Sequence, residues 1–218
     1  MKNHQKGFTL VEIAIVLVII GLLLGGVLKG QELINSAKVK NLANDFRSIP
    51  TFVYAYQDKF RALPGDDRDA VGHIGAAAAT NGNASGRIDG NWNAEPAGGA
   101  CPSESCNFWD HVRRANLATG SLVLDANFFP RNSEGGLVGI TGITPIPGWT
   151  GNFFVCSTNI QGRFARQLDL TMDDGNTATG NVRVLCQGTC ASVAAAANAP
   201  ANLTVANDGD LYTVCSSS

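Results

Sequence analysis

Residues 8–28 read FTLVEIAIVLVIIGLLLGGVL, and this stretch decides the fold of the N-terminal part of the chain. Sixteen of its 21 residues are apolar, and Glu12 is the only one that can ionise. As an α-helix it would be about 31 Å long at about 1.5 Å per residue, which matches a bilayer hydrocarbon core of about 30 Å. Residues 1–7 carry Lys2 and Lys6 and no acid. The positive-inside bias therefore keeps this end in the cytoplasm and exports the rest of the chain.

Two simpler explanations fit this stretch less well. A secretory signal peptide has an apolar run of about 7–15 residues followed by a small-x-small cleavage site, whereas this run is longer and no such site follows it. A plain single-pass anchor fits the length, but it gives no reason for Glu12. A carboxylate inside a membrane span costs free energy and by default indicates a function.

Residues 6–24, KGFTLVEIAIVLVIIGLLL, resemble the N-terminal signature of type IV pilins and of the related type II secretion pseudopilins. The signature is a short basic leader that ends in Gly, then Phe-Thr-Leu-Val-Glu, then an apolar helix. The resemblance implies cleavage between Gly7 and Phe8 by the prepilin peptidase, with N-methylation of the new Phe8 amine. It also implies a single-pass protein of the bacterial inner membrane, with its N-terminus in the cytoplasm, that later joins a periplasmic or extracellular filament.

Glu12 has a physical role in such a filament. Where apolar helices pack without water, each new N-terminus carries a positive amine that a carboxylate on a neighbouring helix can pair with. We expect this pair to set the axial register of the subunits. Gly21, Gly25 and Gly26 indicate either close helix packing or a segment that unwinds when the subunit leaves the lipid.

The apolar run continues as an amphipathic helix. After Leu28 the apolar residues recur at steps of three and four, with polar residues between them, which predicts one helix up to Leu63. Pro50 should kink or locally break it, and Pro64-Gly65 should end it. The apolar stripe consists of Leu42, Phe46, Ile49, Val53, Tyr56, Phe60 and Leu63.

We call residues 64–218 the head, and their sequence predicts an α+β domain. Residues 107–120 read as a short helix, and residues 163–175 are ambiguous between helix and strand, with helix favoured. Segments rich in β-branched and aromatic residues predict strands in residues 137–143, 152–157, 181–186 and 211–215. Together with the resemblance this gives a pilin-like lollipop, in which a long helix with a membrane half and an amphipathic half packs on an antiparallel β-sheet.

The predicted division of the chain has four parts. They are a cleaved leader (1–7), a transmembrane and filament-core helix (8–28), its amphipathic continuation (29–63) and the α+β head (64–218).

Six cysteines follow the span, and export places them in an oxidising compartment where disulfides form. They are Cys101, Cys106, Cys156, Cys186, Cys190 and Cys215. Cys156 and Cys215 each end a predicted strand, which favours a bond between them, with the other four closing two short local loops. The alternative is a loop from Cys190 to Cys215, which resembles the C-terminal disulfide loop of many pilins.

Residues 81–89 overlay a calcium-loop pattern, with oxygen-bearing side chains at Asn81, Asn83, Ser85 and Asp89. The first ligand is a neutral Asn, and Trp92 stands where a bidentate Glu belongs. A plain Gly/Asn-rich turn is therefore favoured over weak calcium binding. Residues 173–176, Asp-Asp-Gly-Asn, are a weaker candidate still and read as a turn. We expect no other cofactor.

Motifs and charge argue against an enzyme. The chain has no GxSxG, HExxH, P-loop or dinucleotide motif, and His111 is expected to be a surface or capping residue. Loss of the leader takes the net charge from −2 to −4, which disfavours nucleic-acid binding unless arginines form a basic strip. The candidate arginines are Arg113, Arg114, Arg163, Arg166 and Arg183.

The expected function is a structural pilin of a type IV pilus-like filament. Its expected partners are further copies or other pilins in a mixed filament, the prepilin peptidase and the inner-membrane assembly machinery, with no small-molecule substrate. The alternatives are a type II secretion pseudopilin, or a minor pilin with an adhesive or DNA-binding role.

Overall fold

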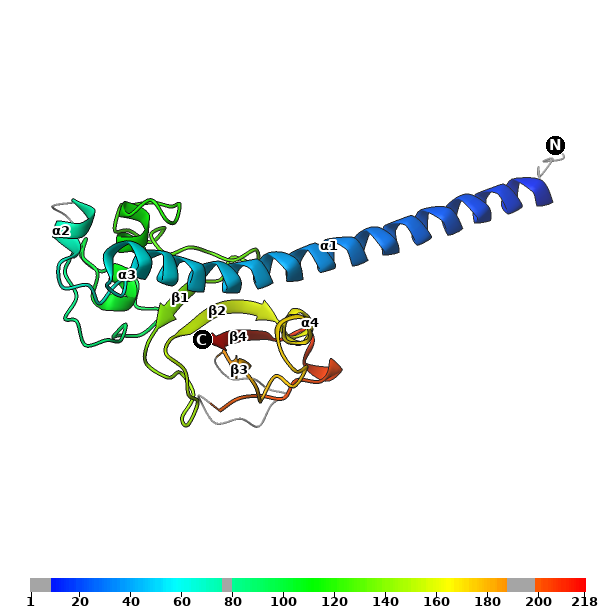
Figure 1. The fold of residues 1–218 in the computed structure, drawn as a ribbon. Coiled ribbons are helices and arrows are strands. Elements are labelled where there is room, and N and C mark those ends of the chain that lie inside the picture. The colour runs from blue at the N-terminus through cyan, green and yellow to red at the C-terminus, as the bar shows by residue number, and fades with distance from the viewer. Residues whose placement is uncertain (1–8, 76–79, 188–198) are drawn as a thin grey trace. The chain divides into compact units, whose positions relative to one another are not determined.

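The structure is a computed structural model that describes residues 9–75, 80–187 and 199–218 (Figure 1). The chain divides into two compact units, one that extends to Lys38 and one from Val39 to Ser218. In chain order the elements are α1 (Leu10–Phe60), α2 (Ala70–Ile74), α3 (Glu104–Arg114), β1 (Val138–Thr141), β2 (Phe154–Gln161), α4 (Gly162–Met172), β3 (Val182–Cys186), η1 (Val205–Asn207) and β4 (Leu211–Ser217).

The part of α1 that belongs to the second unit packs on the sheet (Figure 1). Its buried residues follow the predicted spacing of three and four, and they share one core with Val155, Val184 and Val214 of the strands. The predicted α+β fold, with a long helix on an antiparallel sheet, is confirmed. The buried residues of α1 are Val39, Leu42, Ala43, Phe46, Ile49, Val53 and Tyr56.

Two local predictions for α1 differ from the structure. A break at Pro50 is wrong, because Pro50 lies inside the helix, whereas a kink there stays a prediction. Proline removes one backbone donor, but Ile49 and Val53 are only 2% and 1% exposed, and their packing holds this turn in place. The helix also ends at Phe60, before the predicted end, because Arg61 adopts a left-handed φ of 57°.

The four strands form one sheet in the order β1-β2-β4-β3, and every neighbouring pair is antiparallel. All four predicted strand segments are present, and β2 and β4 extend beyond their predicted ends. In this order β2 and β4 are the two interior strands. The β2–β4 register is irregular between Ser157 and Ile160, where Asn159 has a φ of 58°.

Alternate residues of the interior strands face two different clusters. Val155 and Val214 face the main core with α1, and Phe164 of α4 joins the same core. Cys156 and Cys215 belong to a smaller cluster on the opposite face of the sheet. That cluster also contains Ile146, Trp149, Phe154 and Leu185.

Candidate functional site

The N-terminus of α1 is capped by reciprocal hydrogen bonds between Thr9 and Glu12. The Thr9 N–H donates to Glu12 Oε2 (2.8 Å), and the Glu12 N–H donates to Thr9 Oγ1 (3.3 Å). The Thr9 hydroxyl also donates to Glu12 Oε2 (2.8 Å). This is a capping box, in which the two side chains satisfy each other's backbone donors. The sequence prediction missed this role, although the Thr-x-x-Glu spacing is its usual signal.

The apolar first half of α1 is open to its surroundings. Its large apolar side chains between Leu10 and Leu28 are 45–90% exposed. An 18-residue window of α1 has a mean hydropathy of 2.8, and none of it is buried. By length and composition the helix is able to cross a bilayer. Because exposing so much apolar surface to water costs free energy, this surface needs lipid or other apolar helices around it.

Three glycines in this half of α1 have no contact that requires a glycine. A Cβ atom added at Gly21, Gly25 or Gly26 would meet no heavy atom within 4 Å. Each glycine destabilises a helix by about 1 kcal/mol relative to alanine. The reason for these residues therefore lies outside the single folded chain. Close packing between neighbouring helices and unwinding during assembly both stay predictions.

A family model described as the prokaryotic N-terminal methylation motif matches residues 2–28. The chain carries the prepilin signature of type IV pilins and pseudopilins. No curated protein matches the chain. The signature points to a structural protein, not an enzyme, and suggests processing by prepilin peptidase and polymerisation into filaments. With the apolar half of α1 it fits a protein that is anchored in the inner membrane and then assembled. The predicted cleavage site, Gly7 and Phe8, lies outside the described residues.

The head contains a buried polar cluster around Asp67, just after α1. The Tyr56 hydroxyl donates to Asp67 Oδ2 (2.8 Å), His73 Nδ1 bonds the same oxygen (2.7 Å), and the Asp69 N–H donates to Oδ1 (2.9 Å). Burial alone would raise the pKa of Asp67, but the hydrogen bonds from His73, Asp69 and Tyr56 bring it below its ordinary value. Asp67 therefore acts as an ionised acceptor that ties the segment after α1 back to the helix.

Two more buried carboxylates, Asp66 and Glu104, hold the loop of residues 82–89. Each accepts two backbone N–H groups of the loop, so the loop is shaped around carboxylates supplied by other segments. Burial raises the pKa of Glu104, although two of these N–H groups oppose the rise. The donors are Ser85 and Gly86 to Asp66, and Asn83 and Asp89 to Glu104, at 2.7–2.9 Å.

The four predicted calcium ligands lie in or beside this loop, and their side-chain oxygens already take part in hydrogen bonds within the protein. Asn81 Oδ1 accepts a backbone N–H of α2 (3.1 Å), and Asn83 Oδ1 accepts the Ser85 N–H (2.7 Å). The Ser85 hydroxyl donates to the carbonyl of Arg87 (3.2 Å). The Arg87 guanidinium bonds Asp89 (2.7 Å) and holds the pKa of that carboxyl below its usual range. Calcium binding at this loop stays a prediction.

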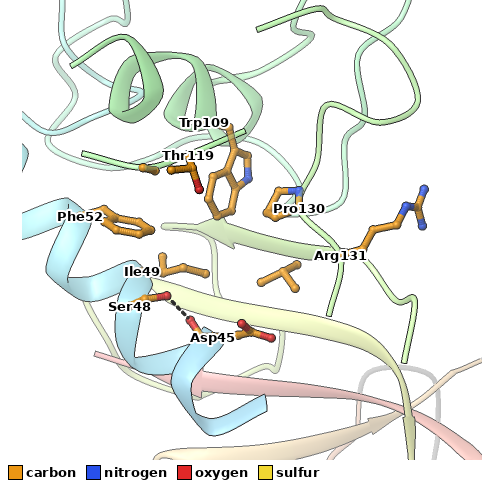
Figure 2. A pocket seen from close by; sticks show the side chains of 10 residues that line it. Asp45, Ser48, Ile49, Phe52, Trp109, Thr119, Pro130 and Arg131 are labelled. Atoms are coloured by element: carbon orange, nitrogen blue, oxygen red, sulfur yellow. Dashed lines mark hydrogen bonds between the residues drawn. The ribbon is translucent and has the colours of Figure 1, made fainter. Parts of the chain in front are cut away.

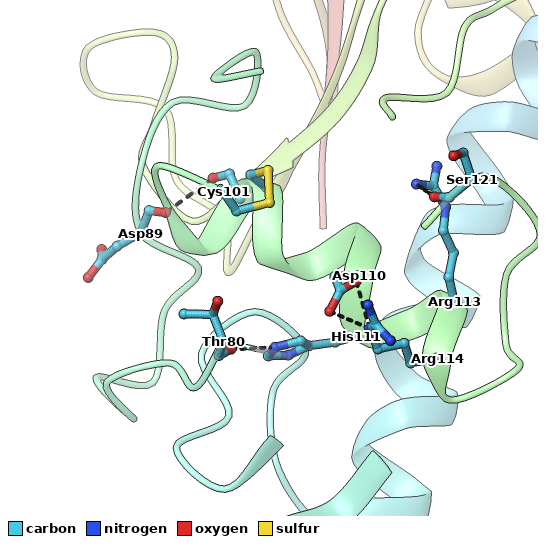
Figure 3. The surroundings of a disulfide bond; sticks show 10 residues. Thr80, Asp89, Cys101, Asp110, His111, Arg113, Arg114 and Ser121 are labelled. Atoms are coloured by element: carbon cyan, nitrogen blue, oxygen red, sulfur yellow. Dashed lines mark hydrogen bonds and ion pairs between the residues drawn. A yellow bond between two sulfur atoms is a disulfide. The ribbon is translucent and has the colours of Figure 1, made fainter. Parts of the chain in front are cut away.

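His111 is fully buried, so the prediction of a surface or capping histidine is wrong. Figure 3 shows its ring directed toward Thr80. Its Nδ1 accepts the Gly65 N–H (2.9 Å), and its Nε2 lies 2.8 Å from the Thr80 carbonyl, to which it donates. Both ring nitrogens are therefore satisfied by the neutral imidazole. Burial lowers the pKa of His111. The partners lie 46 and 31 residues away in the chain, so no local pattern could have revealed them.

We expect His111 to make the head less stable in mild acid. The unfolded chain binds a proton at this histidine near pH 6.5, whereas the folded chain resists it, so stability falls as the pH drops below about 6.5. At about pH 5.5 the loss is at most about 1.4 kcal/mol relative to neutral pH. Urea unfolding of wild type and His111→Gln at about pH 7.5 and about pH 5.5 measures it. Equal pH dependence in the two proteins would contradict this assignment.

The structure contains the disulfides Cys156–Cys215 and Cys101–Cys106. The first joins directly opposed residues of β2 and β4, and the second links the start of α3 to the residues before it (Figure 3). The pairing matches the one that the predicted strand ends favoured. The alternative bond from Cys190 to Cys215 is wrong, because Cys215 is in register with Cys156. Cys190 lies outside the described residues, so the predicted Cys186–Cys190 pair is not tested.

A mostly apolar cavity of about 210 Å³ lies between α1, α3 and the segment that leads to β1 (Figure 2). Ile49, Phe52 and Trp109 contribute to its wall, and burial raises the pKa of Asp45 at its edge. It is smaller than ligand pockets of about 300–1,000 Å³. The lining has no His or Cys, and its Ser48 hydroxyl donates to a backbone carbonyl (3.0 Å). The lining therefore contains no Ser–His or Cys–His pair.

Three of the arginines predicted for a basic strip are engaged within the head. Arg114 pairs with Asp110 in α3 (2.8 Å; Figure 3), and Arg166 pairs with Asp208 (2.6 Å). Arg113 is only 6% exposed. These contacts reduce the positive charge that a nucleic acid would meet.

A cluster of carboxylates lies at the C-terminal end of α4. One oxygen from each of Asp169, Asp173 and Asp174 lies within 4.8 Å of the others. Burial, followed by the charges of Asp173 and Asp174, raises the pKa of Asp169 to about 6, and the Gly175 N–H acts in the opposite direction. The sequence predicted only a turn here. The missed signal is the four-residue spacing that brings Asp173, just after α4, one helical turn from Asp169, where its N–H donates to the Asp169 carbonyl (2.7 Å).

Proposed function

We propose that the chain is a structural pilin of a type IV pilus-like filament. Prepilin peptidase cleaves after Gly7, and the new Phe8 amine is methylated. Residues 8–28 hold the subunit in the inner membrane and then pack in the filament core. The observation that carries this proposal is the exposed apolar half of α1, which lies within the matched methylation motif and carries Glu12 in its first turn.

The position of Glu12 supports a contact between subunits. Both side-chain and backbone donors of Thr9 use Glu12 Oε2, so Oε1 keeps its acceptor capacity for a further donor. The amine of a neighbouring Phe8 supplies that donor and the opposite charge. In an apolar filament core such a pair is far more favourable than either charge alone.

A pilus is favoured over a secretion pseudopilus by the covalent bracing of the head. Two described disulfides stabilise the head, which suits a filament exposed outside the cell, although the periplasm is oxidising enough for them to form. The alternatives are a type II secretion pseudopilin and a minor pilin with an adhesive or DNA-binding role. The partners in this proposal are other pilins, the prepilin peptidase and the inner-membrane assembly machinery.

Filaments sheared from the native cell test the proposal when they are imaged and their subunits are identified by mass spectrometry. We expect this chain in extracellular filaments, with a first peptide that begins at methylated Phe8. Confinement to the periplasm together with a secretion defect on deletion would favour the pseudopilin. Intact leader residues in the mature protein would contradict the whole proposal.

A further inference from the structure

The carboxylate cluster of Asp169, Asp173 and Asp174 has the dimensions of a single-cation site. Calcium binds oxygen ligands at about 2.3–2.6 Å, so two oxygens on opposite sides of one ion lie about 4.6–5.2 Å apart. The three candidate oxygens lie within 4.8 Å of one another. One ion placed among them can therefore contact all three carboxylates.

Asp169 is the feature that sets this cluster apart from an ordinary acidic turn. It is fully buried, and apart from the influence of the nearby Gly175 N–H neither of its carboxylate oxygens has a hydrogen-bond partner among the described residues. Leaving a buried carboxylate without donors costs several kcal/mol in general terms, so native proteins pair such groups with donors, cations or metals. The Asp169 carboxylate instead points to the oxygens of two further acids.

The loop after α4 holds the other two acids in place. Asp173 Oδ2 accepts the N–H of Val182 at the start of β3 (2.8 Å). Asp174 Oδ1 accepts the Asn176 N–H (2.8 Å), and its Oδ2 accepts the Thr179 hydroxyl (3.0 Å). Each carboxylate has about four acceptor positions, so both keep capacity for a cation.

Glycine at position 180 keeps the space beside this cluster open. Gly180 has a φ of 73°, and a Cβ atom there would collide with Asp173 Oδ2. A larger residue would therefore displace one of the three acids.

The described residues provide no salt-bridge partner for this cluster. In the described part of the chain, none of the ion pairs involves Asp169, Asp173 or Asp174. The two internal segments outside the description, residues 76–79 and 188–198, contain no Lys, Arg or His. The ion pairs of the described residues therefore leave the negative charge of this cluster open to a cation from solution.

We propose that Asp169, Asp173 and Asp174 bind a calcium ion that links the end of α4 to the start of β3. The donor set consists only of carboxylate oxygens, which suits a hard cation, whereas zinc sites usually contain Cys or His. Calcium is favoured over magnesium because it accepts irregular geometry and six to eight oxygen ligands, and water and backbone carbonyls complete the shell. This inference is independent of which filament the chain joins.

Calcium titration of the full chain in detergent, after removal of metal with EDTA, tests the site. We expect heat of binding in calorimetry, with a Kd of about 0.1–1 mM as in extracellular calcium modules. At about 100 times Kd, calcium should raise Tm by about 5–10 °C, and the same concentration of magnesium should do much less. No binding heat and no Tm change at about 10 mM calcium would overturn the proposal.

Matched variants test whether calcium binds at this cluster. Asp169→Asn should abolish the binding heat and the calcium-induced rise in Tm. It should also raise the Tm of the metal-free protein, because an uncompensated buried charge is removed. Asp174→Asn should weaken binding at least about tenfold. Asp125→Asn is the control for Asp174→Asn. Both aspartates are exposed, and each accepts the backbone N–H of the residue two positions later at 2.8 Å. Asp125 does not belong to the carboxylate cluster. Asp125→Asn should respond as wild type does.

A second set of outcomes separates this site from the loop of residues 81–89. Asp89→Asn should keep the full calcium response. A response that survives in Asp169→Asn and disappears in Asp89→Asn would overturn the proposal and assign binding to that loop. A response that persists in both variants would also overturn it, since the ion would then bind elsewhere.

Discussion

Glu12→Ala is expected to stop filament assembly in the native cell while leader cleavage stays largely intact. The substitution removes the carboxylate proposed to pair with the N-terminal amine of a neighbouring subunit. Leaving one charge of a buried pair without its partner typically costs about 3–5 kcal/mol. Electron microscopy of filaments, together with the mass of the processed N-terminus, measures both parts of the expectation. Normal filaments from Glu12→Ala would contradict it.

The capping box offers a competing reason for the same defect, and Glu12→Gln separates the two. Glutamine at this position retains the capping hydrogen bonds but carries no charge. If the charge pair controls assembly, Glu12→Gln fails as Glu12→Ala does. Thr9→Ala is the matched control, because it removes the cap at a cost of about 0.5–2 kcal/mol and leaves the carboxylate in place. Assembly by Glu12→Gln with failure of Thr9→Ala would show that capping is the decisive role.

Removal of the Cys156–Cys215 bond by a double substitution to Ala should lower the free energy of unfolding of the head by about 4 kcal/mol. The bond closes a loop with a sequence separation of 59, and cross-linking a long loop restricts the unfolded chain strongly. A domain is stable by only about 5–15 kcal/mol, so the variant should also accumulate poorly in cells. Urea unfolding followed by tryptophan fluorescence is a suitable measurement, since Trp149 belongs to the same cluster as this disulfide.

The Cys101–Cys106 bond provides the internal control for that prediction. Its sequence separation is only 5, so the same double substitution to Ala should cost about 2 kcal/mol. Both pairs are replaced by the same residue, and the difference between the two variants reflects loop length and local packing. A larger loss from the Cys101–Cys106 variant would show that loop closure is not the main source of stability here.

The elements of this fold were predictable wherever one local periodicity controls the outcome. The steps of three and four from Leu42 to Tyr56 are enough to define the buried face of α1, because a helix repeats every 3.6 residues. β-Branched runs such as residues 182–186 likewise identified their strands. The end of α1 was missed because it depends on the left-handed conformation of Arg61, which sequence patterns rarely indicate for an arginine.

The polar sites were predictable only where their members are neighbours in the chain. The signature around Gly7 and Glu12 is local, and the methylation motif matches it, while the roles of these two residues stay predictions. The burial of His111 depends on Gly65 and Thr80, which only the tertiary fold brings to it. The candidate loop at residues 81–89 matched a calcium pattern by spacing, yet the structure engages its oxygens in hydrogen bonds. The unpartnered carboxylate is Asp169, which sits in an otherwise unremarkable helix.

The place of β4 in the sheet determines when the head can finish folding. This strand lies between β2 and β3, and both reach the translating ribosome's exit before it does. Until residues 211–217 have been made, β2 and β3 have no common neighbour and Cys156 has no partner. Closure of the sheet is therefore a late, long-range event that is slow compared with helix formation. A chain that stops before Leu211 would present open strand edges of β2 and β3 to proteases, so β4 determines whether these edges are covered.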